Sequence, residues 1–177
     1  MPFIRANVDA PFGAIPYDEP ARCSEYRTDV GAAAIYPGDL VGQMADGCVD
    51  TITSATASHI LGVAAHYLAA AAATKILVYD HPDQRFTMQD DGDTTTMTAL
   101  SEGANALPIL TTGNTTSLRS AHEIDASSIS VLTEFPLRIQ RLHPVEADSY
   151  ASAAGSPRRW IVSINPGYHQ LATSSGI

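Results

Sequence analysis

The clearest alternation of hydrophobic and polar residues lies in the segment 74–92, which reads TKILVYDHPDQRFTMQDDG. Its apolar run Ile76–Tyr79 is rich in β-branched and aromatic residues, a composition that is typical of a buried strand. Asp80–Pro82 ends this run, because proline restricts its own φ and pushes the preceding residue out of the helical region. We therefore expect a strand that stops at a corner.

A second strand is predicted at Gln84–Gln89, directly after this corner. Phe86 and Met88 share one face there, while the other face carries polar residues: Arg85, Thr87 and Gln89. Asp91-Gly92 follows and favours a hairpin turn, because glycine accepts positive φ at little cost. The segment predicts strand, corner, strand and turn, which is the spine of a β-sheet domain.

Further strands are predicted on both sides of this spine. Two of them have a clear period of two, with Leu137 and Ile139 on one face of Phe135–Leu142 and Trp160 and Val162 on one face of Arg158–Asn165. Shorter strands are predicted at Leu40-Val41, Cys48–Ile52, Ser58–Ala65 and Ser128–Leu132, with turns at Pro37-Gly38 and Asp46-Gly47 and a bulge or close backbone contact at Gly62.

Helix signals are weak. The five alanines Ala69–Ala73 have high helix propensity but no apolar stripe, so they predict a loop or a single helical turn. The segments 93–120 and 144–157 are rich in small and polar residues and predict long loops, with Leu107–Leu110 as a short strand. The chain is therefore expected to be all-β, with under about a fifth helix.

The first 37 residues differ from the rest of the chain. Five prolines between Pro2 and Pro37 prevent a continuous hydrogen-bond ladder and favour an extended arm. This arm carries too many large apolar residues for a solvated linker: Phe3, Ile4, Phe12, Ile15, Tyr17 and Tyr26. It is expected to pack on its own domain or on a neighbouring subunit, and residues 38–177 are expected to form one domain.

Composition narrows the functional classes. The chain has 177 residues, of which 45% are hydrophobic and only 16% charged, and it includes a single lysine, Lys75. The net charge of −9 argues against a broad electrostatic contact with nucleic acid or with an anionic membrane. There is no apparent signal peptide, and the apolar stretch Ile60–Ala73 is too short to cross a bilayer. We expect a soluble protein that is made in a cytoplasm.

Metal and cofactor sites are not expected. Cys23 and Cys48 lack metal-ligand spacing and predict two free thiols rather than a disulfide. Asp80, His81 and Asp83, with His66 one strand earlier, offer too few ligands for a metal and predict a solvent-exposed corner. The acidic residues Asp90, Asp91 and Asp93 lack the spacing of a calcium loop and predict a turn.

Catalytic motifs are also missing from the sequence, which contains no G-x-S-x-G and no phosphate-binding loop. Four arginines in the last two predicted strands instead suggest one basic patch: Arg138, Arg141, Arg158 and Arg159. Such a patch is either a solvated face or an interface for an acidic partner.

Several segments together resemble the structural cement or decoration proteins of tailed-bacteriophage heads. GDLVG at 38–42 and ILGVAAH at 60–66 precede the long motif LVYDHPDQRFTMQDDG at 77–92. LRIQRLHP at 137–144 and WIVSINPGYHQL at 160–171 resemble the end of these proteins. The likeness covers about residues 31–171 without the middle loops, and it departs at His81, where an acidic residue is expected.

The resemblance implies a single β-barrel or jelly-roll-like domain that binds the outer capsid surface and cements neighbouring major capsid subunits. Its partners would be the major capsid protein and copies of itself, and its place would be the capsid exterior of the virion, after assembly in the host cytoplasm. It implies no catalysis, no cofactor and no small-molecule substrate. The candidate contact residues are Phe3, Ile4, Phe12, Ile15, Tyr17, Arg138, Arg141, Arg158 and Arg159.

Two other classes compete with this interpretation. One is a small β-barrel domain of a phage tail or cell surface that binds or hydrolyses carbohydrate, which would need a concave cluster of acids and aromatic residues. The other is a main coat subunit. It is disfavoured because no amphipathic helix is long enough to form the spine helix of the common phage coat fold.

Overall fold

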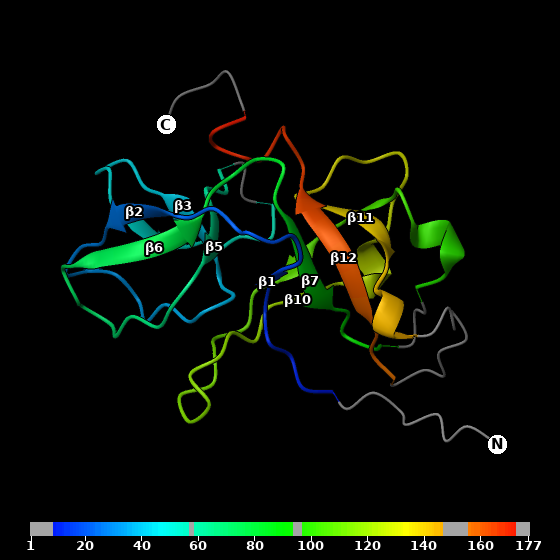
Figure 1. Ribbon diagram of the computed structural model, residues 1–177, viewed down its shortest axis with the longest axis horizontal. Coiled ribbons are helices and arrows are strands. Elements are labelled where there is room, and N and C mark those ends of the chain that lie inside the picture. The colour runs from blue at the N-terminus through cyan, green and yellow to red at the C-terminus, as the bar shows by residue number, and fades with distance from the viewer. Residues whose placement is uncertain (1–8, 57–58, 94–96, 147–155, 173–177) are drawn as a thin grey trace.

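The computed structural model describes residues 9–56, 59–93, 97–146 and 156–172 of the chain. Within these ranges the chain folds into two five-stranded antiparallel sheets and one two-stranded sheet (Figure 1). The helical elements described there are three 3₁₀ turns of three residues each. The prediction of an all-β protein is confirmed.

The first large sheet, sheet I, has the strand order β1-β7-β12-β11-β8. Its long strands are β11 (Leu137–Leu142) and β12 (Arg159–Ile164), which pair along most of their length. Strand β7 (Arg85–Gln89) lies on the other side of β12. The edges are short, and they are formed by β1 (Ile15–Pro16) and β8 (Asn105–Ala106).

The second large sheet, sheet II, has the order β2-β6-β5-β3-β4. Its strands are β2 (Ser24–Arg27), β3 (Leu40–Gln43), β4 (Val49–Thr51), β5 (Gly62–Ala64) and β6 (Lys75–Tyr79). The small sheet pairs β9 (Pro108–Ile109) with β10 (Glu123–Ile124). Sheets I and II both have free edges, so neither forms a closed barrel by itself.

The main hydrophobic core lies between the two large sheets. Trp160, Phe86 and Ile139 point into it from sheet I, as the period-two pattern of their strands predicts. Leu40 and Val63 enter it from sheet II, where they are cross-strand neighbours. The inward alternation of both sheets therefore builds one shared core.

The opposite face of sheet II has a second, smaller core of aliphatic side chains. Val41, Ile76 and Val78 form it from the strands. Ile35 and Leu68 cover it from the two loops beside the sheet, and their backbones pair in an isolated bridge. The inner strands β3 and β5 are thus buried on both faces, which explains why they read as short apolar runs rather than as alternating patterns.

A buried carboxylate fixes the start of β12 against the end of β7. Asp90 Oδ1 accepts a hydrogen bond of 2.9 Å from the Arg158 backbone N–H, and Asp90 Oδ2 accepts one of 2.9 Å from the indole N–H of Trp160. Burial raises the pKa of Asp90, while these two donors oppose the rise. Asp90 therefore has a structural role, because it holds β7 and β12 together.

Gly62 confirms the predicted close backbone contact. A Cβ at this position would lie 2.1 Å from the carbonyl oxygen of Tyr79 in the neighbouring strand β6. Only glycine lets the two backbones approach so closely without displacing one of them.

The described part of the N-terminal arm lies on the chain's own domain. Ile15 and Pro16 pair with Thr87 and Phe86 as strand β1, and Ser24–Arg27 pairs with β6. Strand β1 ends at Pro16, and Pro20 lies between the two strands, so the arm forms no continuous ladder, as expected. These two segments therefore belong to the chain's own sheets, while Phe3 and Ile4 lie outside the described residues.

Two local predictions are wrong. Asp91-Gly92 does not close a hairpin, because β7 pairs with β1 and β12 instead of with the next strand along the chain. Ser128–Leu132 is not a strand, and Leu132 is 95% exposed. Ser130 pairs with Asn105 in an isolated bridge, and its hydroxyl accepts the N–H groups of Leu132 and Thr133, so local side-chain bonds end the pairing there.

Other predictions agree with the structure. Ala69–Ala73 is a loop with one turn, and Gly47 forms the predicted hairpin between β3 and β4 at a φ of +79°. Cys23 and Cys48 are both free, and they precede strands on opposite edges of sheet II. In the described ranges we find no helix whose length and hydropathy would let it cross a membrane.

Candidate functional site

The outer face of sheet I carries an array of arginines, which we call the arginine face: Arg85, Arg138, Arg141 and Arg159. The strand register places them in three cross-strand rows. Arg85 and Arg138 flank Ser163 in the first row, Arg141 lies beside Ile161 in the second, and Arg159 lies beside Gln89 in the third. Strands β7, β12 and β11 therefore present these side chains together.

A β-bulge brings Arg141 onto this face. Residues 138 and 141 are three positions apart, so a regular strand would direct them to opposite faces. The register of β11 shifts between Ile139 and Arg141, and this extra residue restores Arg141 to the side of Arg138. Both arginines are exposed.

Tyr17 of the N-terminal arm lies across the arginine face. Its hydroxyl accepts a hydrogen bond of 3.1 Å from Arg141, and the Arg85 guanidinium lies 5.3 Å from its ring centroid. Its ring also meets His143 edge-on at 5.7 Å. Tyr17 thus contacts residues of both β7 and β11, the two strands that flank β12.

Asp18 supplies an acidic partner for one of these arginines. Both of its carboxylate oxygens accept from the Arg85 guanidinium, at 2.9 Å and 2.5 Å. This hydrogen bonding lowers the pKa of Asp18 and raises that of Arg85. The pair fixes the arm to β7 at the residue next to Tyr17.

The sequence-predicted contact residues do not all lie on the arginine face. Arg138, Arg141 and Arg159 share the arginine face with Tyr17, whereas Arg158 is only 8% exposed and binds Asp90 through its backbone. The predicted patch of four arginines is thus wrong in one member. Arg85 belongs to the face instead, and its outward position followed from the alternation in β7.

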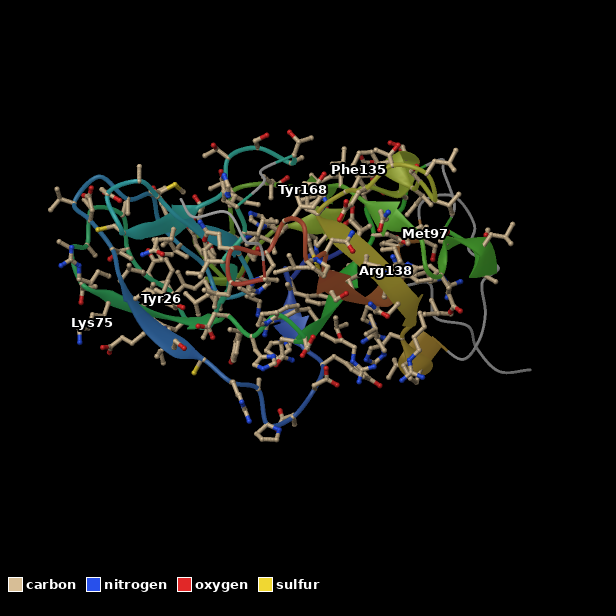
Figure 2. The ribbon with its side chains drawn as sticks, turned by 90° about the horizontal axis from the view of Figure 1, so that it is seen from above. Tyr26, Lys75, Met97, Phe135, Arg138 and Tyr168 are labelled. Atoms are coloured by element: carbon tan, nitrogen blue, oxygen red, sulfur yellow. The ribbon has the colours of Figure 1, made fainter. Side chains whose placement is uncertain are left out.

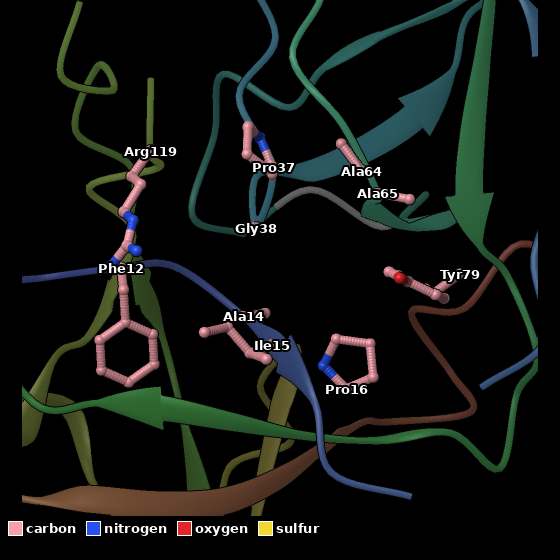
Figure 3. A pocket seen from close by; sticks show the side chains of 10 residues that line it. All are labelled: Phe12, Ala14, Ile15, Pro16, Pro37, Gly38, Ala64, Ala65, Tyr79 and Arg119. Atoms are coloured by element: carbon pink, nitrogen blue, oxygen red, sulfur yellow. The ribbon is translucent and has the colours of Figure 1, made fainter. Parts of the chain in front are cut away.

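Phe12 and Ile15 line a different feature, a pocket of about 250 Å³ between the arm and the two sheets (Figure 3). Ala64 and Tyr79 close its other side from the ends of β5 and β6. Ile15 is 48% exposed. This pocket is mainly apolar.

A buried His122–Asp39 pair was not predicted from the sequence. The residues lie 83 positions apart and match no motif, so no spacing could have revealed them. His122 Nε2 lies 3.6 Å from Asp39 Oδ1, and both side chains are almost fully buried. Burial lowers the pKa of His122, and the charge of Asp39 opposes this.

The backbone fixes the tautomer of His122. Its Nδ1 accepts a hydrogen bond of 3.1 Å from the Leu40 N–H, so Nδ1 carries no proton. The proton of the neutral ring is then on Nε2, which faces Asp39. No nitrogen of this histidine remains to bind a metal or to take a proton from a nucleophile, so the pair cannot serve a hydrolytic triad.

The corner at Asp80 is structural and partly buried, contrary to the prediction of an exposed corner. Asp80 is 8% exposed and accepts a hydrogen bond of 2.6 Å from the Tyr26 hydroxyl. His81 accepts the Asp83 N–H through Nδ1. Across the described ranges, no three His, Cys, Asp or Glu side chains are grouped so that they could hold a metal ion.

Glu123 in β10 is the most perturbed carboxyl group near the surface. Burial, together with the charges of Asp9, Asp91 and Asp90, raises its pKa to about 7. Its Oε1 atom is buried without a hydrogen-bond partner. The stability of the small sheet is therefore expected to depend on pH.

The chain matches no protein family model, no curated protein and no solved structure. Its function is therefore inferred from the arrangement of its own residues.

Proposed function

We propose that the chain is a structural protein of a tailed-bacteriophage head, which binds the outside of the capsid and holds neighbouring major capsid subunits together. In this proposal the partners are the major capsid protein and further copies of the chain. The site of action is the capsid exterior of the virion, and the chain has no catalytic role.

The segments that resemble capsid decoration proteins support this proposal, because they form the framework of both large sheets. GDLVG contains the start of β3, and ILGVAAH contains β5. The long motif at 77–92 runs from β6 through the Asp80 corner into β7, and the two C-terminal motifs contain β11 and all of β12 except Arg159. The residues that resemble decoration proteins are thus those that form the central strands of the two large sheets.

The arginine face is the single observation that carries the proposal. A chain with a net charge of −9 gathers Arg138, Arg141 and Arg159 on one sheet face, held in place by strand pairing and by Tyr17. Arginine is enriched at protein interfaces, and its planar guanidinium pairs with two carboxylate oxygens at once. An acidic protein surface is the partner that this face fits, since the net charge disfavours nucleic acid.

We also propose that sheets I and II together form the single β-barrel or jelly-roll-like domain that the resemblance implies. The absence of a catalytic role is supported by the tautomer of His122, whose two nitrogens are both directed to groups of the chain itself.

The test is a co-sedimentation assay with capsids of the phage whose genome encodes the chain, assembled without it. Purified chain should sediment with the capsids and saturate at a fixed ratio to the coat protein. Arg138→Glu should weaken this binding about tenfold, because it places a like charge opposite an acidic surface. Its melting temperature should be unchanged, since Arg138 is exposed.

Arg27→Glu is the matched control. Arg27 is also an exposed strand arginine, but it pairs with Lys75 in sheet II, and Figure 2 shows Lys75 at the end of the molecule away from Arg138. Both variants change the net charge equally. Equal weakening by the two variants would remove the arginine face from the proposal, and failure of the unaltered chain to bind capsids would refute the proposal itself.

A further inference from the structure

A second pocket, of about 340 Å³, lies above the buried His122–Asp39 pair. We call it the threonine pocket, because its rim carries four threonines: Thr51, Thr53, Thr111 and Thr112. It is formed where the ends of β4 and β9 meet the loop before β3. The arginine face plays no part in it.

The floor of this pocket is rigid. Asp39 Oδ2 accepts a hydrogen bond of 2.8 Å from the Tyr36 N–H, and the Asp39 N–H binds the Tyr36 carbonyl in the same turn. His122 is held through Nδ1 by the Leu40 N–H. The backbone at the start of β3 therefore sets the positions of both side chains before any ligand arrives.

The floor is also incomplete as a hydrogen-bonding network. Asp39 is 2% exposed, yet its Oδ1 has no hydrogen-bond partner among the described residues. The His122 N–H beside it is 3.6 Å away, which is too long for a normal hydrogen bond. A buried acceptor without a donor is costly, so the site favours a group that donates to Asp39.

The ligand group must both donate and accept. It meets the acceptor Oδ1 of Asp39 and, beside it, the donor Nε2–H of His122. A neutral hydroxyl satisfies both atoms at once, donating to the first and accepting from the second. An ammonium group has no acceptor for the histidine proton, and a metal ion finds no free nitrogen lone pair.

The walls fit a ligand with several hydroxyl groups and an apolar face. The threonine hydroxyls can both donate and accept at the rim, while Ile52 and Leu110 present apolar surface. Mixed walls of this kind are typical of pockets that orient a small molecule by a few polar groups.

We propose that the threonine pocket binds a small neutral polyhydroxylated ligand, a single sugar ring or the terminal ring of a glycan, through the juxtaposed Asp39 carboxylate and His122 imidazole. The ring is bound and not converted, because neither histidine nitrogen can act as a base there. This activity is independent of capsid binding.

The proposal is tested by titrating the ¹⁵N-labelled chain with monosaccharides and following the amide chemical shifts. At least one of glucose, galactose, mannose or N-acetylglucosamine should shift the Leu40 and His122 amides saturably, with a dissociation constant of about 1 mM, as expected for about a dozen non-hydrogen atoms. No saturable shift at these amides up to about 50 mM would show that water alone completes the site, and would overturn the proposal.

Two variants separate the pocket from the rest of the surface. Ala33→Trp fills the pocket from an exposed position, and it should abolish the shifts. Ala70→Trp makes the same change at an exposed alanine of the loop between β5 and β6, and it should leave them unchanged. Shifts that persist in Ala33→Trp would locate the binding elsewhere and refute the assignment.

Asp39→Asn tests the chemistry. The amide oxygen can keep the bond from the Tyr36 N–H, but its NH₂ group then replaces the acceptor that faces the pocket. Binding should fall at least tenfold in a variant whose amide spectrum remains dispersed. Retained affinity would exclude Asp39 as the ligand's acceptor, and if this variant does not fold, the comparison of the two tryptophan variants decides.

Discussion

Sheets I and II are built from the same number of strands but are stabilised in different ways. Sheet I has two central strands of six residues and directs large side chains, Trp160, Phe86 and Met88 among them, into the main core. Sheet II has strands of three to five residues and small aliphatic side chains on its second core. Its strands approach each other closely at Gly62.

This difference indicates which kind of substitution destabilises each sheet. Sheet I depends on volume, so removing a large side chain leaves a cavity that the surrounding residues fill only partly. Sheet II depends on backbone proximity, so adding a single carbon atom forces strands apart. The following substitutions test these two sensitivities and then the surface groups that each sheet carries.

The largest effect is expected from Trp160→Ala. The substitution removes a fully buried side chain and leaves Asp90 Oδ2 without the indole donor. It should lower the free energy of unfolding by about 4–5 kcal/mol, compared with about 2–4 kcal/mol for Ile76→Ala in the second core. Urea denaturation followed by circular dichroism measures both, and a larger loss at Ile76 would reverse the comparison between the sheets.

Gly62→Ala is expected to cost about 2–3 kcal/mol in spite of the small change. The added Cβ would meet the Tyr79 carbonyl at 2.1 Å, which requires β5 and β6 to separate. Gly31→Ala is the matched control, because its Cβ meets nothing closer than 3.5 Å. It should change stability by less than about 0.5 kcal/mol. Similar melting temperatures for the two variants would show that β5 and β6 can separate freely.

Tyr17→Ala should cost about 1–2 kcal/mol, because it removes a half-buried aromatic ring and ends its contacts with Arg85 and Arg141. Tyr17→Phe keeps the ring and loses only the hydroxyl that accepts from Arg141, so its cost should stay below about 1 kcal/mol. Differential scanning calorimetry compares the two. Equal losses would mean that the hydroxyl, rather than the ring, holds the arm on sheet I.

The smallest effect, about 1 kcal/mol, depends on pH and concerns Glu123 in the small sheet. Its pKa is about 7 in the folded chain, against an ordinary 4.5, so the folded state binds more protons between these values. The stability linked to this group is complete below about pH 4.5 and is lost as pH rises through 7. The group is only half-buried, which keeps the effect well below that of a fully desolvated carboxyl.

Glu123→Gln should remove this dependence. The difference in unfolding free energy between variant and unaltered chain should favour the variant by about 1 kcal/mol more at pH 8 than at pH 4.5. Paired urea titrations at the two pH values measure it. A difference that stays constant with pH would show that Glu123 keeps an ordinary pKa.

The sequence predicts those strands in which apolar and polar residues alternate, because this pattern buries one face and exposes the other. The alternation of Phe86 with Met88 and of Trp160 with Val162 was sufficient for β7 and β12, because each strand has one apolar face. Strand β2 is not predicted, because it lies at the edge of sheet II, where Ser24 and Glu25 are exposed and give no apolar pattern. The hairpin expected at Asp91-Gly92 failed because the partner of β7 comes from the far end of the chain.

The candidate sites were less predictable. Arg138 and Arg141 share a face only because of a bulge, which no pattern in the sequence marks. The pair joins Asp39, directly before β3, to His122, directly before β10, and a lone buried histidine has no signature in one sequence. Arg158 departs from the predicted patch because its side chain is buried, while its backbone N–H binds Asp90.

The pairing of β7 with β12 also governs when the molecule can fold. Asp90 and Trp160 are 70 residues apart, whereas all five strands of sheet II come from residues 24–79. All strands of sheet II are therefore synthesised before β12, the central neighbour of β7 in sheet I. The loop between β7 and β12 is long, so the pairing of these two strands is slow. Until β12 is synthesised, β7 has an unpaired edge of the kind that recruits strands from other chains. Newly made protein should thus aggregate most readily when translation stops before residue 159.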